Sequence, residues 1–175
     1  NEVFRRAPVS GAELAAAGGN EKTRYRVSGT WYDQKGIVIS SGYRRIGGRA
    51  NLDFSVNDRL HFSTNVSLTG ERNNRVEADD NLEGIVGNAI AHEPYFPVRQ
   101  PDGRFTNIGD GMAYVNAVDL ATHNTTLATT NTILASIEGR YTITPNLSVT
   151  SRLGTDFYNL TEEQFQSPLV PGSDG

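Results

Sequence analysis

The sequence of 175 residues contains no cysteine, which excludes disulfides and thiolate metal ligands. It also has no apolar run of about 20 residues, the length that a membrane-spanning helix needs. A basic excess is missing as well, since the formal net charge is -4. Nucleic-acid binding draws most of its affinity from positive charge, so we expect no nucleic-acid partner.

The ends of the chain show neither an initiator methionine nor a signal-peptide pattern. The first residues are Asn1, Glu2, Val3 and Phe4, without a basic or an apolar segment, and the last are Pro171 to Gly175. We therefore expect this chain to be a piece of a longer protein.

What the sequence does contain is typical of strands and turns. Glycine occurs 18 times, and serine, threonine and asparagine are frequent. The mean hydropathy is low, at -0.45. A strand of a membrane barrel is nevertheless compatible with it, because only every second residue of about ten has to be apolar.

Alternation with a period of two marks the strands. Between residues 49 and 56 the even positions are apolar and the odd ones polar, and the pattern resumes at Leu60 after Asn57-Asp58-Arg59. A three-residue loop there would pair Val56 with Leu60, Phe54 with Phe62 and Leu52 with Thr64, so that both strands present their apolar side chains on one face.

The same combination of alternation and turn length predicts two further hairpins. One joins the apolar series from Ile133 to Ile143 through Thr144-Pro145-Asn146 to the series from Leu147 to Phe157. The other pairs Leu14, Ala16 and Gly18 with the strand that contains Tyr25, Val27 and Trp31, across a turn at 20–22.

The predicted fold class is all-β: an antiparallel transmembrane β-barrel segment of about six strands in three hairpins, with one long extracellular loop that contains a short helix. The strand bounds are 12–18, 23–34, 43–56, 60–70, 131–143 and 147–160, and the loop covers 71–130. Tight turns alternate with long connections, as in outer-membrane barrels. Six strands cannot close a plugged barrel of about 22 strands, so we expect the edge strands to pair with material outside this chain.

Four aromatic residues on the apolar parity lie near the tight turns. These are Tyr25, Phe54, Phe62 and Tyr141. Their similar height predicts a membrane-interface girdle, although aromatic residues also favour strands in general.

Several strings resemble the SusC/RagA family of TonB-linked outer-membrane proteins. The most specific is Gly18-Gly19-Asn20-Glu21-Lys22-Thr23-Arg24-Tyr25, followed by Val27-Ser28-Gly29, by Tyr32-Asp33-Gln34-Lys35-Gly36-Ile37-Val38 and by Arg49-Ala50-Asn51-Leu52-Asp53. Phe4-Arg5-Arg6-Ala7-Pro8-Val9 resembles the junction between plug and barrel, and Asn116-Ala117-Val118 to Asn131 the end of a long loop. Ala15, Ala17 and Asp119 depart from the family pattern.

This resemblance implies a two-part organisation, with residues 1–11 as the end of the plug and its junction, and 12–175 as partial barrel. It implies import of a bulky nutrient, an oligosaccharide or peptide, across the outer membrane of a Gram-negative, Bacteroidota-like bacterium. The implied partners are outer-membrane lipid, a SusD-like surface lipoprotein and TonB, the last through a part of the protein outside these residues. A passive porin-like or structural barrel and a secreted carbohydrate-binding or hydrolytic β-protein remain alternatives.

No catalytic, cofactor or metal site is predicted. Asp79, Asp80 and Glu83 are the most enzyme-like cluster, with His92 and Glu93 nearby, but Asp80 and Glu83 have the spacing of a capping box for a helix from Leu82 to about Ala91. The histidines His61, His92 and His123 lack metal-ligand spacing. Asp102-Gly103 and Asp110-Gly111 are turn pairs.

Substrate contacts are expected in the long loop, because loops of this length frequently carry function. The candidates are Tyr95, Phe96, Arg99, Arg104, Phe105 and Tyr114, which could instead pack the loop against neighbouring elements. For the lumen-facing Arg24, Arg26, Arg49, Arg140 and Arg152, pairing with plug carboxylates is favoured over substrate binding.

Overall fold

The computed structural model describes residues 2–76 and 84–171. Six strands form one antiparallel sheet in the order β1-β2-β3-β4-β5-β6, which confirms the predicted fold class. The strands are β1 (Val9–Gly19), β2 (Thr23–Lys35), β3 (Gly42–Asn57), β4 (Leu60–Arg75), β5 (Thr125–Thr144) and β6 (Leu147–Phe165). Within the described residues the sheet does not close, and β1 and β6 each pair on one side only.

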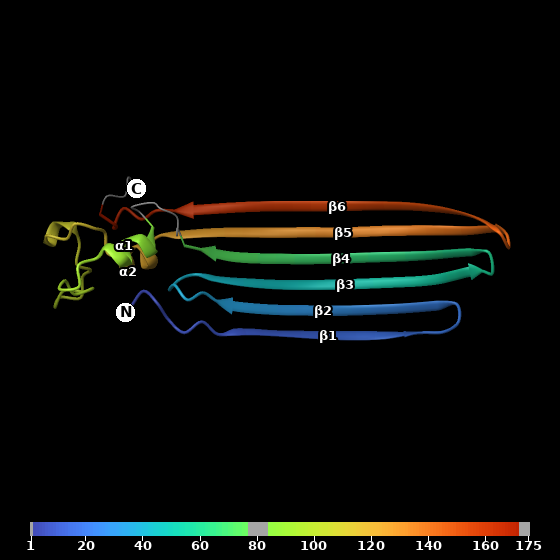
Figure 1. Ribbon diagram of the computed structural model, residues 1–175, viewed down its shortest axis with the longest axis horizontal. Coiled ribbons are helices and arrows are strands. Elements are labelled where there is room, and N and C mark those ends of the chain that lie inside the picture. Colours follow the sequence, from blue (N-terminus) through green and yellow to red (C-terminus); the bar gives the residue numbers. More distant parts are fainter. Residues whose placement is uncertain (1, 77–83, 172–175) are drawn as a thin grey trace.

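The connections differ at the two ends of the sheet. Three tight turns lie at one end, and the longer segments, the helices and both termini lie at the other (Figure 1). At the first turn Gly19 has a φ of 153°, and a Cβ there would lie 2.2 Å from the carbonyl oxygen of Thr23. Asn20 completes this turn, because its side chain accepts hydrogen bonds from the backbone N–H groups of Lys22 and Thr23.

The predicted register of the strands is largely correct. Phe54 pairs with Phe62 and Leu52 with Thr64, but Val56 does not pair with Leu60. Leu60 instead pairs with Asn57, and a register shift falls between Ser55 and Asn57. The reason is local: the Asn57 side chain accepts hydrogen bonds from the N–H groups of Arg59 and Leu60, which tightens the turn by one residue and leaves Val56 in a bulge.

All six strands are longer than predicted, chiefly at the end that carries the long connections. β1 begins at Val9 rather than at 12, β4 continues to Arg75 rather than to 70, and β5 begins at Thr125 rather than at 131. The long loop therefore covers 76–124 instead of 71–130. The additional residues continue the backbone ladder beyond the point where the apolar alternation ends.

The long loop contains more helix than predicted. Its helices are α1 (Ile85–Ala91), the 3-10 helix η1 (Ile108–Asp110) and α2 (Ala117–His123). Helix α1 ends at the predicted residue, but its N-cap is Gly84, which makes no side-chain capping bond. The predicted start at Leu82 and the acidic cluster of Asp79, Asp80 and Glu83 lie outside the described residues.

Almost all buried apolar residues lie at the loop end of the molecule. The loop core, as we name it, consists of Val3, Val38, Ile85, Ala117, Val118, Leu120, Ala121 and Val170. It joins the N-terminal segment, the β2–β3 connection, both helices of the long loop and the segment after β6. Residues 3–5 run antiparallel to residues 37–39, with Phe4 bridging Val38 and the Arg5 N–H donating to the carbonyl of Ile37 at 2.8 Å.

Candidate functional site

One face of the sheet is apolar across all six strands. In the central part of the strands, the register aligns residues of one parity into continuous rows, such as Ala16, Val27, Ala50, Val66, Ala135 and Thr155, or Leu14, Gly29, Gly48, Leu68, Ile133 and Phe157. We call these rows the apolar band. On β3 it covers residues 46–54, a length that matches the roughly 9–11 residues with which a barrel strand crosses a bilayer.

The four aromatic residues predicted to form a girdle share the apolar face near the tight turns. Phe54 and Phe62 are stacked, with ring centroids 5.3 Å apart. The ring of Tyr25 lies against Gly18 on β1, and the ring of Phe62 lies against Gly139 on β5. Tyr141 pairs with Leu60 one row nearer the turns. Two of the four rings, those of Tyr25 and Phe62, thus cover neighbouring glycines, and the position of all four at a membrane interface remains a prediction.

The opposite face is polar and carries ion pairs between neighbouring strands. Arg26 lies 3.9 Å from Glu13, and Arg152 forms a hydrogen-bonded ion pair with Glu138. For Arg24, Arg49 and Arg140, the described part of the chain supplies no ion-pair partner.

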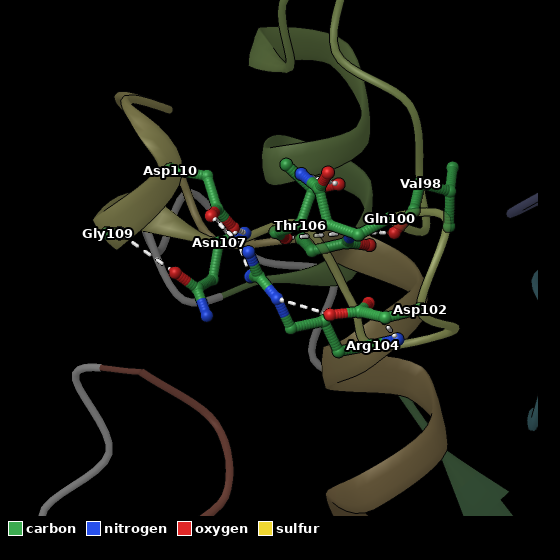
Figure 2. A network of polar contacts seen from close by, with 9 residues as sticks. Val98, Gln100, Asp102, Arg104, Thr106, Asn107, Gly109 and Asp110 are labelled. Atoms are coloured by element: carbon green, nitrogen blue, oxygen red, sulfur yellow. Dashed lines mark hydrogen bonds and ion pairs between the residues drawn. The ribbon is translucent and has the colours of Figure 1, made fainter.

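The long loop holds a polar network around one guanidinium group (Figure 2). Arg104 donates from both terminal nitrogens to the carboxylate of Asp110, each at 2.7 Å, and from Nε to Asp102 at 3.2 Å. The backbone N–H of Asn107 also donates to Asp110 at 3.0 Å. The Arg104 hydrogen bonds, and after them the Asn107 bond, lower the pKa of Asp110 from 3.8 to about 2. The predicted turns at both Asp-Gly pairs are present, with φ values of 87° at Gly103 and 96° at Gly111.

Asn116 connects this network to helix α2 and is almost completely buried, at 1% exposure. Its side-chain oxygen accepts from the N–H groups of Val118 and Asp119 and so caps the helix. Its side-chain nitrogen donates to the carbonyl oxygens of Val98 at 2.8 Å and Thr106 at 3.1 Å. One amide therefore fixes three segments of the loop.

Asn88 plays a similar part on helix α1. Its nitrogen donates to the carbonyl of Gly84 at 2.9 Å, and its oxygen accepts from the N–H of Val115 at 3.1 Å. Sequence reasoning missed this residue, because nothing in the local pattern distinguishes a buried asparagine from an exposed one. Asn116 could be recognised only as part of a family-like string.

The six predicted substrate residues separate into two groups and one single residue. Arg99 stacks on Phe105, with its Cζ 3.8 Å from the ring centroid, and together with Arg104 they hold the hairpin of residues 98–106. Phe105 also contacts the His123 ring edge to face at 5.7 Å. Tyr95 and Phe96 form a separate pair at 4.6 Å, and Tyr114 is partly exposed. Tyr95 is the most accessible of these rings, at 74%.

The three histidines lie in separate parts of the fold. Nδ1 of His61 is 2.7 Å from the Ser55 hydroxyl on the sheet, and Nδ1 of His123 is 2.6 Å from Asp119 in α2. In residues 2–76 and 84–171, no group of three or more His, Asp or Glu side chains is arranged to hold a metal ion. None of the helices in that part of the chain has the length and apolar character needed to span a membrane.

The fold defines a class: an antiparallel barrel-type wall segment with a helix-containing loop at one end. No protein-family profile matches the chain. It is 29% identical over 171 residues to TonB-dependent receptor P26 of Formosa agariphila, covering 94% of this chain and 16% of that receptor. It is 27% identical over 118 residues to TonB-dependent receptor SusC of Bacteroides thetaiotaomicron, covering 67% of this chain and 11% of SusC.

Solved structures show the same fold. The RagAB peptide importer in its closed-closed state superposes with a TM-score of 0.76 at 19% identity, covering 98% of this chain and 20% of that chain. The chain thus spans a fifth or less of these matched proteins. Together the matches confirm the predicted resemblance: the chain is similar to part of a SusC/RagA-like, TonB-dependent outer-membrane transporter.

Proposed function

We propose that this chain forms six strands of the wall, and one outer loop, of a TonB-dependent outer-membrane importer of a bulky nutrient, either an oligosaccharide or a peptide. The observation that carries the proposal is the apolar band, which continues across all six strands while the opposite face is polar. A sheet with these two faces fits lipid on one side and a polar lumen on the other. The named receptors that the chain resembles support the same assignment.

The long loop would then lie outside the cell, because all three tight turns lie at the opposite end of the sheet. In this arrangement Tyr95 and Tyr114 are the candidates best placed to contact a substrate, because the side chains of Arg99, Arg104 and Phe105 are engaged in contacts with other residues of the loop. A SusD-like surface lipoprotein would cover the loops, and TonB would act through a part of the protein outside this chain. Residues 1–11 would form the junction with a plug, with residues 9–11 already paired as the start of β1.

A passive porin-like or structural barrel is the second candidate, because it would need the same two-faced sheet. Uptake of oligosaccharides and peptides by cells that produce the full-length parent protein, with and without a functional TonB, separates the two. We expect uptake to stop without TonB, whereas uptake that continues unchanged would establish a passive channel. A parent protein that stays monomeric and folded without detergent would contradict both the importer and the passive barrel.

A further inference from the structure

A positively charged groove lies on the apolar face of the sheet, immediately beyond the apolar band at the loop end. Its volume is about 350 Å³, and its charged lining residues are Arg5, Lys35, Arg44, Arg72 and Asp33. Asp33, Arg44 and Arg72 form one cross-strand row on β2, β3 and β4, and they share the parity of the apolar residues. Lys35, Gly42 and Asn74 of the lining share this parity as well, while Gln34 and Tyr43 have the opposite one, so most strand residues that line the groove lie on the side of the band.

The groove begins one row above the last apolar residues of β2 and β3. Trp31 pairs with Ile46, and Asp33 pairs with Arg44 two residues further on, a step of about 6.6 Å along a strand. Trp31 is 43% exposed on this face. Tryptophan is enriched where the hydrocarbon of a membrane meets its headgroups, so the charged row lies at headgroup height when the band lies in hydrocarbon.

The charges in the groove do not balance. Arg44 and Arg72 are direct cross-strand partners, an arrangement of like charges that is unfavourable by itself. Among the described residues of the lining, Asp33 is the single carboxylate, and it binds Arg44 at 2.9 Å and Lys35 at 3.8 Å. Arg72 has no ion-pair partner in the part of the chain that the structure describes.

Two further residues define the surroundings of the groove. Arg5 is held in place by neutral groups, since its guanidinium donates to the carbonyl oxygens of Gly36 at 3.1 Å and Ser41 at 2.8 Å. Glu163 is a further carboxylate of the same parity; it lines an adjoining cavity together with Arg72 and lies two strands away from Asn74. Among the described lining residues four cations thus share one carboxylate, and this part of the groove carries a positive charge that an anion can balance.

We infer that this groove binds the phosphate of a phosphorylated lipid headgroup in the outer leaflet of the membrane. Guanidinium groups offer paired donors that match phosphate oxygens, and basic pockets at membrane surfaces bind anionic headgroups. The acyl chains of such a lipid would lie along the apolar band below Trp31. The inference rests on the proposed membrane placement and goes beyond the proposed transport.

The test uses the full-length parent protein in detergent micelles and native mass spectrometry. The probe is a phosphorylated outer-leaflet glycolipid, compared with the same lipid after removal of its phosphates. We expect the protein to bind the phosphorylated lipid about tenfold more tightly, and the double variant Arg44→Gln, Arg72→Gln to lose that preference. The matched control, Arg24→Gln with Arg49→Gln, removes two charges from the polar face and should keep the preference.

A second variant pair separates loss of charge from loss of fold. Arg44→Lys with Arg72→Lys should retain a preference for the phosphorylated lipid, weaker than that of the unaltered protein. Equal binding of both lipids by the unaltered protein would overturn the inference, and so would a preference that survives in the Gln pair. Inorganic phosphate that competes as strongly as the lipid would show a free-anion site and also overturn it. Failure of TonB-dependent uptake with an intact lipid preference would instead contradict only the proposed function.

Discussion

The sheet and the long loop stabilise themselves in different ways. Among the described residues, Ala128 is the only buried apolar residue that lies in a strand, whereas helix α2 alone contributes four residues to the loop core. The strands are joined by continuous backbone hydrogen bonds, but both faces of the sheet are largely exposed. The burial of their apolar side chains therefore depends on the surroundings of the sheet. The loop buries its own apolar side chains and satisfies its buried amides internally, as a water-soluble domain does. The same chain therefore contains a sheet whose apolar face is uncovered within the described residues and a loop with an apolar core of its own.

The largest expected effect on this contrast comes from a charge placed in the middle of the apolar band. Val66→Arg on β4 should weaken folding of the full-length protein into lipid vesicles by about 2–4 kcal/mol, because the guanidinium would have to enter hydrocarbon. Ser67→Arg, one residue along and on the polar face, is the matched control and should change little. Gel-shift folding titrations in urea measure both. Equal losses for the two variants would show that the apolar face is not in contact with lipid.

The loop should respond to the loss of a buried amide instead. Asn116→Ala removes the cap of α2 and leaves the carbonyl oxygens of Val98 and Thr106 without this donor, a cost of about 1–3 kcal/mol. Hydrogen exchange of the full-length protein should show faster exchange in the loop and unchanged exchange in β3 and β4. Asn65→Ala on the polar face of the sheet is the control. Slower exchange or no change in the loop would contradict the role assigned to Asn116.

The smallest expected effect is a loss of loop stability at acidic pH. The pKa of Asp110 is lowered from 3.8 to about 2 in the folded loop, so the folded state binds its proton less readily than the unfolded state. The stability that this carboxylate contributes is therefore fully present above about pH 4 and is lost as the pH falls toward 2. The protection factors for hydrogen exchange in the 98–111 segment, which correct for the pH dependence of intrinsic exchange, should fall in that window and stay flat in the Asp110→Asn variant. A pH response that persists in Asp110→Asn would assign it to another group.

Alternation of side chains was enough to predict the strands where one face is apolar. It failed where that contrast ends. Beyond Gly70 on β4 the chain is polar on both faces, and before Asn131 on β5 the adjacent Leu127 and Ala128 place one apolar residue on each face, yet the backbone ladder continues to Arg75 and from Thr125. The pairing of Val56 with Leu60 was wrong for a similar reason, because the hydrogen bonds of the Asn57 side chain, rather than the hydrophobic pattern, set the turn.

By itself the sequence determined the two-faced sheet, its hairpins and its resemblance to TonB-dependent receptors, because these depend on neighbouring residues and on a period of two. Only the tertiary structure decided which residues form the loop core and the charged groove. Val3, Val38, Leu120 and Val170 are far apart in the chain and meet through packing, and Arg5 approaches Arg44 and Arg72 because residues 3–5 pair with 37–39. Such contacts depend on how distant segments pack against one another, and a pattern of neighbouring residues does not predict this packing.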